Sequence, residues 1–270
     1  MDYELHELVI GYPGHEVAGP MTASLHQGEL CCLLGANGAG KSTLLRTLAA
    51  FQSPLSGEML LDGRSLSAIA PRELSTLVGI VLTERIRTAG ITVRDMVAMG
   101  RSPYTNFWGH LTETDHHYIN EAMEQVGVAS FASRQISTLS DGERQKVMIA
   151  KALAQQTPVI LLDEPTAFLD FPSKVEVMLL LRRLAHEMGK SIFLSTHDLD
   201  MALQTADRLW LMGKKDTDAA PQAQQPATGT QQPRQFAIGT PQELVNEIPQ
   251  YFPSRHVSFD ATNLRFNIQC

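Results

Sequence analysis

Hydrophobic positions alternate with a period of two near the N-terminus and form short continuous runs further along the chain. Residues 3–34 alternate and then run apolar up to a glycine-rich segment, which predicts strands. Short apolar runs return at 158–165 ("PVILLDEP") and 191–198 ("SIFLSTHD"). Nearly continuous apolar strands are typical of a parallel sheet that is covered on both faces. The pattern therefore predicts an α/β fold with a mostly parallel core sheet.

Helical periodicity marks the segments between these strands. The segment 41–51 places four apolar side chains on one side, namely Leu44, Leu45, Leu48 and Phe51. We also expect helices from about 141 and over about 173–188, and a mostly helical region with polar breaks over about 84–135. By contrast, "SGEMLLDGRSL" predicts two strands joined by a turn at Asp62–Gly63.

The composition suits a globular chain that does not bind nucleic acid. With 270 residues, the chain can bury the core of one large domain with a small annex. The formal net charge of -7 argues against a nucleic-acid surface, which is usually basic. Three cysteines make no disulfide framework, which favours a reducing cytoplasm. No signal peptide is visible, and no apolar run approaches the roughly 20 residues of a membrane span. If the chain acts at a membrane, we expect another chain to span it.

Three parts follow from the composition along the chain. Residues 2–213 hold the alternating strands and helices, with about 84–135 as an inserted helical subdomain. Residues 214–235 have lost hydrophobic positions and gained Pro, Gln, Ala and Thr, which is typical of a linker or a long surface loop. Residues 236–270 regain hydrophobic positions, and "FDATNLRFNI" predicts a hairpin. We therefore expect one large domain, a Gln/Pro-rich insertion and a C-terminal annex.

A phosphate-binding loop is predicted where the first apolar run ends. The segment "GANGAGKST" matches G-x-x-x-x-G-K-[ST], follows a strand and opens a helix. The glycines let backbone N–H groups converge on phosphate oxygens at the positive end of the helix. Lys41 should reach the β- and γ-phosphates, and the Ser42 hydroxyl should bind Mg²⁺. A glycine-rich turn without a ligand is the alternative to a nucleotide site formed by Gly35, Ala36, Asn37, Gly38, Ala39, Gly40, Lys41, Ser42 and Thr43.

Two acids and a histidine end the later apolar runs. Asp163, at the end of "VILLD", is placed to hold Mg²⁺ through water. Glu164, next to it, can accept a proton from the water that attacks the γ-phosphate. His197 ends "FLSTH" at the mouth of the same sheet, where ligands gather in α/β folds. The alternative is a structural role at the strand ends, but beside the phosphate-binding loop these residues predict ATP hydrolysis.

These motifs occur in the order of a known family. They resemble the Walker A, signature, Walker B, D-loop and switch histidine of an ABC-transporter nucleotide-binding domain, at Gly35–Thr43, Leu139–Glu143, Val159–Glu164, Phe168–Asp170 and His197. The resemblance covers about residues 2–213, resumes at "IGTPQEL" and implies a P-loop NTPase of the ABC ATPase type, whose N-terminal part is an antiparallel β region. It also implies that Tyr12 stacks on adenine and that Glu143 and Asp170 belong to the nucleotide site.

The signature implies a second copy of the chain. In the family, the signature serine and glycine bind the γ-phosphate held by the partner subunit's Walker A loop. The resemblance therefore implies that Ser140 and Gly142 act in trans, in a two-fold dimer that closes on two ATP molecules. A separate multi-span permease would use that motion, and an extracytoplasmic substrate-binding protein would act with it. The implied location is peripheral, at the cytoplasmic face of the bacterial inner membrane.

Two positions depart from the family pattern. Thr83 stands where the family usually has a glutamine that senses Mg²⁺ and couples the site to the permease, and Glu84 follows it. Asp141 stands where the signature commonly has its first glycine, which adds a negative charge near the partner's phosphates. The run "VAMGRSPY" resembles the helical region of importers for iron–siderophore, haem and cobalamin complexes. Residues 83–104 would then form the groove that receives a coupling helix of the permease.

Three functions compete at this point. We favour the ATPase subunit of a bacterial metal-chelate importer. The alternative from another class is a soluble ABC ATPase that acts in assembly, for instance of iron–sulfur clusters. A regulatory protein with little turnover is a third reading, motivated by Thr83 and Asp141. Against it, the intact Lys41, Glu164 and His197 predict Mg²⁺-dependent ATP hydrolysis.

Overall fold

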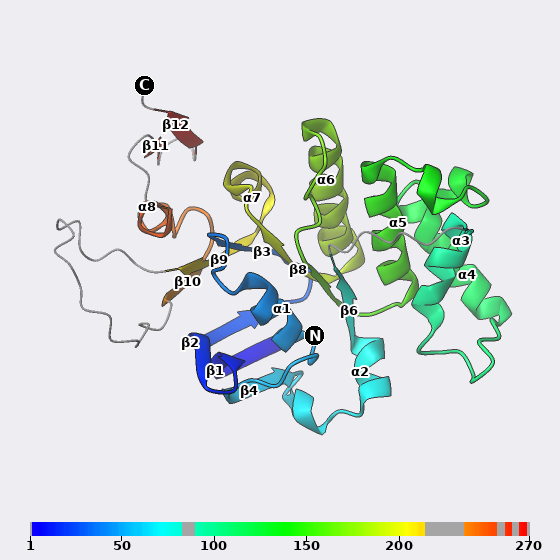
Figure 1. The fold of residues 1–270 in the computed structure, drawn as a ribbon, viewed down its shortest axis with the longest axis horizontal. Helices are drawn as coiled ribbons and strands as arrows, with labels where there is room; N and C mark the ends of the chain where they lie inside the picture. The colour runs from blue at the N-terminus through cyan, green and yellow to red at the C-terminus, as the bar shows by residue number, and fades with distance from the viewer. Residues whose placement is uncertain (1, 83–89, 214–234, 253–256, 261–264, 269–270) are drawn as a thin grey trace.

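A computed structural model describes residues 2–82, 90–213, 235–252, 257–260 and 265–268 (Figure 1). Thr83, Glu84 and nearly all of the Gln/Pro-rich segment lie outside the described residues. None of the helices in the described ranges combines the length and hydropathy of a membrane span.

The core sheet has six strands in the order β10-β9-β3-β8-β7-β6. Its strands are β3 (Leu30–Gly35), β6 (Val78–Val81), β7 (Val159–Leu162), β8 (Ser191–Thr196), β9 (Arg208–Gly213) and β10 (Gln235–Gly239). Only β10 pairs in the antiparallel sense, with β9, so the predicted mostly parallel sheet is confirmed. Because β3, β7 and β8 run in the same direction, the residues that follow them meet at one edge of the sheet.

A second, antiparallel sheet has the order β2-β1-β4-β5. It contains β1 (Tyr3–Tyr12), β2 (His15–Leu25), β4 (Ser56–Leu61) and β5 (Arg64–Ser65). The turn between β4 and β5 lies at Asp62 and Gly63, as predicted, and both have positive φ, 49° and 73°. Two consecutive positive φ values are the mark of a tight hairpin turn whose twist matches its strands.

The helices gather around the core sheet, and α3, α4 and α5 form a group at one end of the molecule, together with the end of α6 (Figure 1). They are α1 (Lys41–Leu48), α2 (Pro71–Leu77), α3 (Val93–Ala98), α4 (Glu113–Gln125), α5 (Asp141–Ala154), α6 (Phe171–Met188), α7 (Leu199–Thr205) and α8 (Ile248–Tyr251), with short 3-10 turns at η1 (Leu66–Ala68), η2 (Met99–Arg101), η3 (Ala129–Phe131) and η4 (Ile136–Thr138). Capping boxes begin α3 at Thr92, α4 at Thr112 and α5 at Ser140.

Two expectations about secondary structure had different outcomes. The predicted hairpin near the C-terminus is confirmed, because β11 (Val257–Asp260) pairs with β12 (Arg265–Ile268). The placement of Phe51 on the apolar side of the first helix was wrong. That helix ends at Leu48, Ala50 adopts a left-handed φ of 55°, and Phe51 is 66% exposed. A left-handed residue turns the chain away from the helix axis, which carries the next side chain off the buried face.

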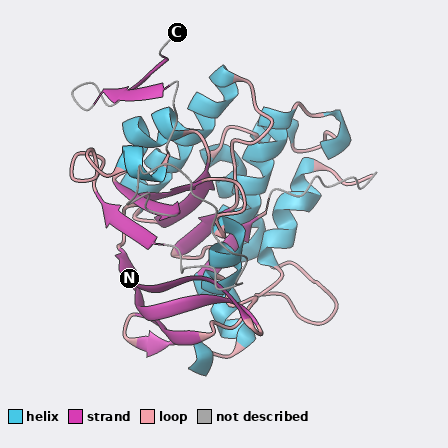
Figure 2. Cartoon of the chain, turned by 60° about the vertical axis from the view of Figure 1, so that its left-hand side comes forward, coloured by secondary structure: helices cyan, strands magenta, loops and turns pink. Residues whose placement is uncertain are grey.

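The core sheet is buried on both faces, which explains its nearly continuous apolar strands. On β3, Leu30, Cys32 and Leu34 pack with residues of α3 to α7 in one hydrophobic cluster. The alternate residues Cys31 and Leu33 pack with α1 and the antiparallel sheet in another. Figure 2 shows the antiparallel sheet as a separate layer from the core sheet. The strand ends that carry the predicted site thus start from a sheet held on both sides.

Candidate active site

A cavity of about 540 Å³ lies beside the phosphate-binding loop. Its lining brings together Tyr12, His15, Val17, Glu164 and all of Asn37–Thr43. The tyrosine and the loop were predicted from the sequence, but His15 and Val17 were not. The hairpin explains their presence, because Tyr12 pairs with His15 directly across β1 and β2. A predicted register for that hairpin would have placed His15 beside Tyr12.

The loop itself is shaped by its glycines and holds Lys41 inward. Gly38 and Gly40 have φ values of 73° and 102°, which favour residues without a side chain. Lys41 is only 6% exposed, and its Nζ donates to the carbonyl oxygens of Gly35 (2.8 Å) and Ala36 (3.4 Å). Burial lowers the pKa of Lys41, and the charges of the two neighbouring carboxylates oppose that shift. The buried ammonium is therefore aimed across the loop at the place where phosphates would lie.

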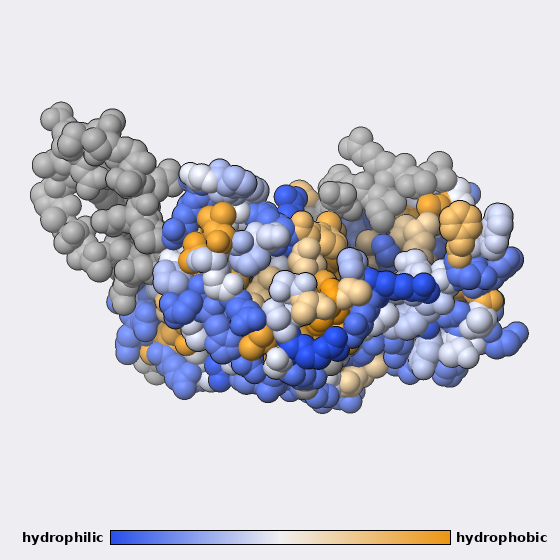
Figure 3. Space-filling view, turned by 90° about the horizontal axis from the view of Figure 1, so that it is seen from below, coloured by the Kyte–Doolittle hydropathy of each residue, from blue (hydrophilic) through white to orange (hydrophobic). Residues whose placement is uncertain are grey.

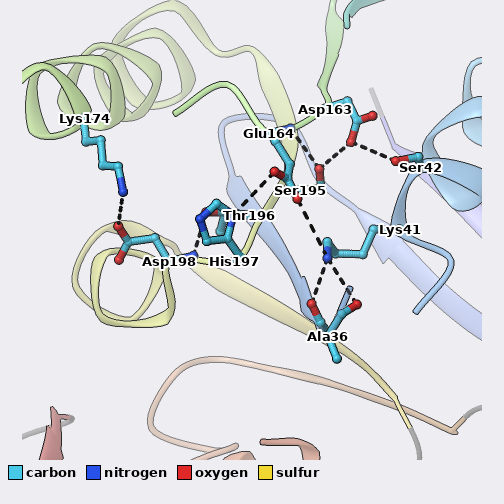
Figure 4. A network of polar contacts seen from close by, with 11 residues as sticks. Ala36, Lys41, Ser42, Asp163, Glu164, Lys174, Ser195, Thr196, His197 and Asp198 are labelled. Carbon is cyan, nitrogen blue, oxygen red and sulfur yellow. Dashed lines mark hydrogen bonds and ion pairs between the residues drawn. The ribbon is translucent and has the colours of Figure 1, made fainter. Parts of the chain in front are cut away.

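Asp163 and Ser42 lie together at the mouth of the loop (Figure 4). The Ser42 hydroxyl donates to Asp163 Oδ1 at 3.3 Å, and the Ser195 hydroxyl donates to the same oxygen at 2.7 Å. A carboxylate and a hydroxyl side by side offer the hard oxygen atoms that Mg²⁺ prefers, so these residues fit the predicted metal. Ser195 was not predicted from the sequence, and β8 places it beside the end of β7 through their parallel pairing.

Glu164 lies between a cation and an imidazole. Its carboxylate is 3.9 Å from Lys41 Nζ through Oε1 and 3.4 Å from His197 Nδ1 through Oε2. Its backbone has a φ of 45°, a left-handed conformation that costs about 1–2 kcal/mol for a residue with a side chain. Its N–H donates to Ser195 Oγ at 2.9 Å, which holds this turn in place. The structure therefore brings Lys41, Glu164 and His197, predicted from three separate segments, into one group.

The signature residues form the start of α5 and do not line the cavity. The Ser140 hydroxyl donates to Glu143 Oε2 at 2.8 Å and accepts from the Glu143 N–H at 3.3 Å. The Ser140 N–H and the Ser140 hydroxyl both donate to this carboxylate, and these two hydrogen bonds hold the pKa of Glu143 below its usual value. Asp170 is the N-cap of α6, and hydrogen bonds from the Ser173 hydroxyl and N–H lower its pKa in the same way. Within one chain, the predicted nucleotide residues therefore fall into two separate groups.

Asp141 forms an ion pair with a neighbouring residue on the same helix. Its Oδ1 is 2.7 Å from Arg144 Nη1, one turn further along α5. Arg144 also donates to the carbonyl oxygen of Leu139 through Nη2 at 2.9 Å. The first turn of a helix favours an acid, and the arginine offsets its charge. This pairing accounts for how an aspartate is accommodated where the signature commonly has a glycine.

Comparisons with known proteins agree with this geometry. The family model described as "ABC transporter" matches residues 19–167. The chain belongs to the ABC transporter family. An achromobactin transport ATP-binding protein of Dickeya dadantii is 38% identical over 89% of this chain and 83% of the relative. An iron(3+)-hydroxamate import ATP-binding protein of Bacillus subtilis is 36% identical over 73% of each chain.

Solved structures of ABC transporters share the fold of this ABC cassette. One chain of an ABC transporter in an inward-facing conformation superimposes with a TM-score of 0.77 at 23% identity, over 99% of this chain and 95% of that one. A bacterial ABC transporter cassette solved as a dimer gives a TM-score of 0.65 at 26% identity, over 77% of this chain and 92% of that one. The predicted P-loop NTPase fold is thereby confirmed.

Proposed function

We propose that this ABC cassette is the ATP-hydrolysing subunit of an importer that takes up a metal chelate through a separate permease. The observation that carries the ATPase part is the meeting of Lys41, Glu164 and His197 beside the cavity. The cargo class is supported by the two relatives, whose names concern achromobactin and iron(3+)-hydroxamate. An iron–siderophore complex is therefore the favoured cargo, with haem and cobalamin as the other members of the proposed class.

The residues of the site divide the work of hydrolysis. Glu164 would accept the proton of the attacking water, since its carboxylate lines the cavity. His197, within reach of that carboxylate, would hold the γ-phosphate and the water in line. Lys41 and the loop N–H groups would bind the β- and γ-phosphates. Ser42 and Asp163 would hold Mg²⁺, which when bound neutralises phosphate charge.

A second copy of the chain would complete each site. Ser140 and Gly142 stand at the N-terminus of α5, away from the cavity of their own chain. A helix N-terminus with free N–H groups is a binding site for an anion such as a phosphate. The dimeric cassette among the structural relatives supports an arrangement in which each signature meets the partner's nucleotide. ATP would then favour the closed dimer, because it contacts both halves only in that state.

A surface on the helical end of the molecule supports the permease part of the proposal. Phe107 and Trp108 are 93% and 78% exposed and lie in the loop between η2 and α4. Met99 and Tyr104, on the predicted "VAMGRSPY" run, are also exposed. Seen from below, hydrophobic residues form a group in the middle of the molecule and a smaller one toward the end where α3 and α4 lie (right in Figure 3). The permease would hold the cassette at the cytoplasmic face of the bacterial inner membrane, with an extracytoplasmic binding protein on the other side.

The permease is tested by purification of the tagged native protein in mild detergent, followed by mass spectrometry of its partners. We expect a multi-span membrane protein, and we expect a Phe107→Ser/Trp108→Ser variant to lose it because the variant removes two exposed aromatic side chains. Phe51→Ser is the matched control, since Phe51 is an exposed aromatic residue that follows α1 and does not belong to this loop. Recovery of soluble partners alone would instead favour the assembly factor. If a permease is recovered, binding assays with iron–siderophore complexes, haem and cobalamin would define the cargo.

Tyr12 is expected to contribute to ATP affinity. Tyr12→Ala should raise the KM for ATP by about tenfold, because the loss of one stacked aromatic ring weakens base binding. Tyr12→Phe should behave almost like the wild type, although it loses the hydroxyl contact with Thr43 at 3.4 Å. Steady-state ATPase assays over a range of ATP concentrations measure both. An equal loss in the two variants would show that the hydroxyl matters and the ring does not.

A further inference from the structure

An ion pair connects α6 with the loop that carries His197 (Figure 4). Lys174 Nζ lies 3.2 Å from Asp198 Oδ2, and the two side chains are only 22% and 23% exposed. Lys174 belongs to the first turn of α6, and Asp198 is the N-cap of α7. Neither residue lines the nucleotide cavity. The pair therefore joins α6 to the start of α7, two elements from separate parts of the sequence.

Asp198 is held at several points, and Lys174 is the one that comes from outside its own loop. The Asp198 N–H donates to Thr196 Oγ1 at 3.0 Å, and its Oδ1 accepts from the Met201 N–H at 3.3 Å. These two bonds shape the loop locally. The contact with Lys174 uses the other carboxylate oxygen, Oδ2. It fixes the loop relative to α6, because Lys174 belongs to that helix. Removal of the Lys174 contact would preserve the local shape of the loop, but the position of the loop relative to α6 would no longer be fixed.

His197 sits between these anchored residues. Thr196 ends the buried strand β8 and Asp198 begins α7, so the backbone that carries the imidazole is held on both sides. Its Nδ1 is 3.4 Å from Glu164 Oε2, a distance that a small shift of the loop would lengthen. Hydrolysis depends steeply on such distances, since catalytic groups act only when aligned. The position of Asp198 thus bears directly on the alignment of His197.

The same first turn of α6 also touches the signature. A Cβ added to Gly142 would lie 3.0 Å from Ser173 Oγ, next to Lys174 in the chain. Asp170 caps this turn through the Ser173 N–H at 3.2 Å. One short segment therefore contacts the signature on one side and the histidine loop on the other. The first turn of α6 is thus one place where the two groups of nucleotide residues in one chain are joined.

We propose that Lys174 is a positioning residue for ATP hydrolysis, which through Asp198 keeps His197 aligned with Glu164. The inference rests on the proposed function, because ATP hydrolysis is the reaction that His197 would serve. A partly exposed ion pair contributes little to stability, so its main effect is on the geometry of the loop. The first turn of α6 then links contact at the signature to the alignment of the hydrolytic group.

The test compares the steady-state ATPase kinetics of full-length variants. Lys174→Gln should lower kcat by at least about fivefold and leave the KM for ATP unchanged, since it moves His197 without touching the loop that binds phosphate. Lys174→Arg should restore kcat, because a guanidinium can still donate to Asp198. The matched control is Lys146→Gln, which removes a lysine paired with Glu176 at 2.6 Å between α5 and α6. Its kcat should equal that of the wild type.

Three results would overturn the inference. An unchanged kcat in Lys174→Gln would show that the pair does not position His197. Equal falls in kcat and in the melting temperature for Lys174→Gln and Lys146→Gln would show general loosening of α6 instead. A wild type that hydrolyses no ATP would remove the inference together with the proposed function. The first of these results, with normal hydrolysis by the wild type, would remove the inference alone.

Discussion

Replacement of Glu164 by glutamine is expected to abolish ATP turnover while ATP binding persists. An amide has nearly the same size as the carboxylate but cannot accept the proton of the attacking water. Loss of a general base costs about 10²–10⁴-fold in rate, so kcat should fall by at least about a hundredfold. Phosphate release measures turnover, and equilibrium binding of a fluorescent ATP analogue measures affinity.

The control for this change is Glu176→Gln, the same substitution at an exposed position on α6. It should leave turnover unchanged, since Glu176 pairs with Lys146 rather than with the site. If Glu164→Gln hydrolysed ATP at the wild-type rate, Glu164 would not be the base. His197 would then be the next candidate, since its imidazole is the neighbouring titratable group.

The combined change Ser140→Ala and Gly142→Val is expected to prevent ATP-driven dimerisation. It removes the hydroxyl at the start of α5 and adds an isopropyl side chain where the helix N-terminus would meet a phosphate. Nucleotide binding by the monomer should remain, because neither residue lines the cavity. Light scattering with and without ATP, in the Glu164→Gln background, measures dimerisation without turnover.

Helix stability must be separated from this effect. Ser140 is an N-cap, and its loss costs about 1 kcal/mol on its own. A Thr112→Ala variant provides the control, because Thr112 caps α4 with the same capping box away from the signature. It should lower the melting temperature by about as much as Ser140→Ala alone and still dimerise, whereas Gly142→Val also crowds Ser173, whose Oγ would lie 3.0 Å from the new Cβ. Equal loss of dimerisation and of monomer ATP binding in the signature variant would sink the assignment in trans.

The part of the site that could be predicted from the sequence is the part encoded in contiguous residues. A phosphate-binding loop places its glycines, Lys41 and Ser42 by local geometry alone, so its motif carries the chemistry directly. Asp163, Glu164 and His197 could be predicted because the ends of neighbouring parallel strands meet at one edge. The fold followed for the same reason, since apolar runs and helical periods repeat in chain order.

The remainder depends on contacts that no local pattern contains. Ser195 lies beside the end of β7 because of the parallel register of β8 with β7, and its hydroxyl joins the Asp163 carboxylate to the Glu164 backbone N–H only in the folded chain. His15 joins the cavity through a hairpin register, and Lys174 reaches Asp198 through the packing of α6 and α7. Polar residues of this kind look like ordinary surface positions in a sequence. The limits of the three parts of the chain stay predictions.

The capping box at the start of α5 has a consequence for the closed dimer. The Ser140 hydroxyl has a single proton, and in this structure it gives that proton to the carboxylate of its own Glu143 at 2.8 Å. A phosphate oxygen of the partner's ATP would have to compete with the Glu143 carboxylate for the same proton. Each closure would thus exchange one hydrogen bond for another rather than add one. Such an exchange would limit the gain in affinity for ATP on closure, which suits a protein that must release its nucleotide in every cycle.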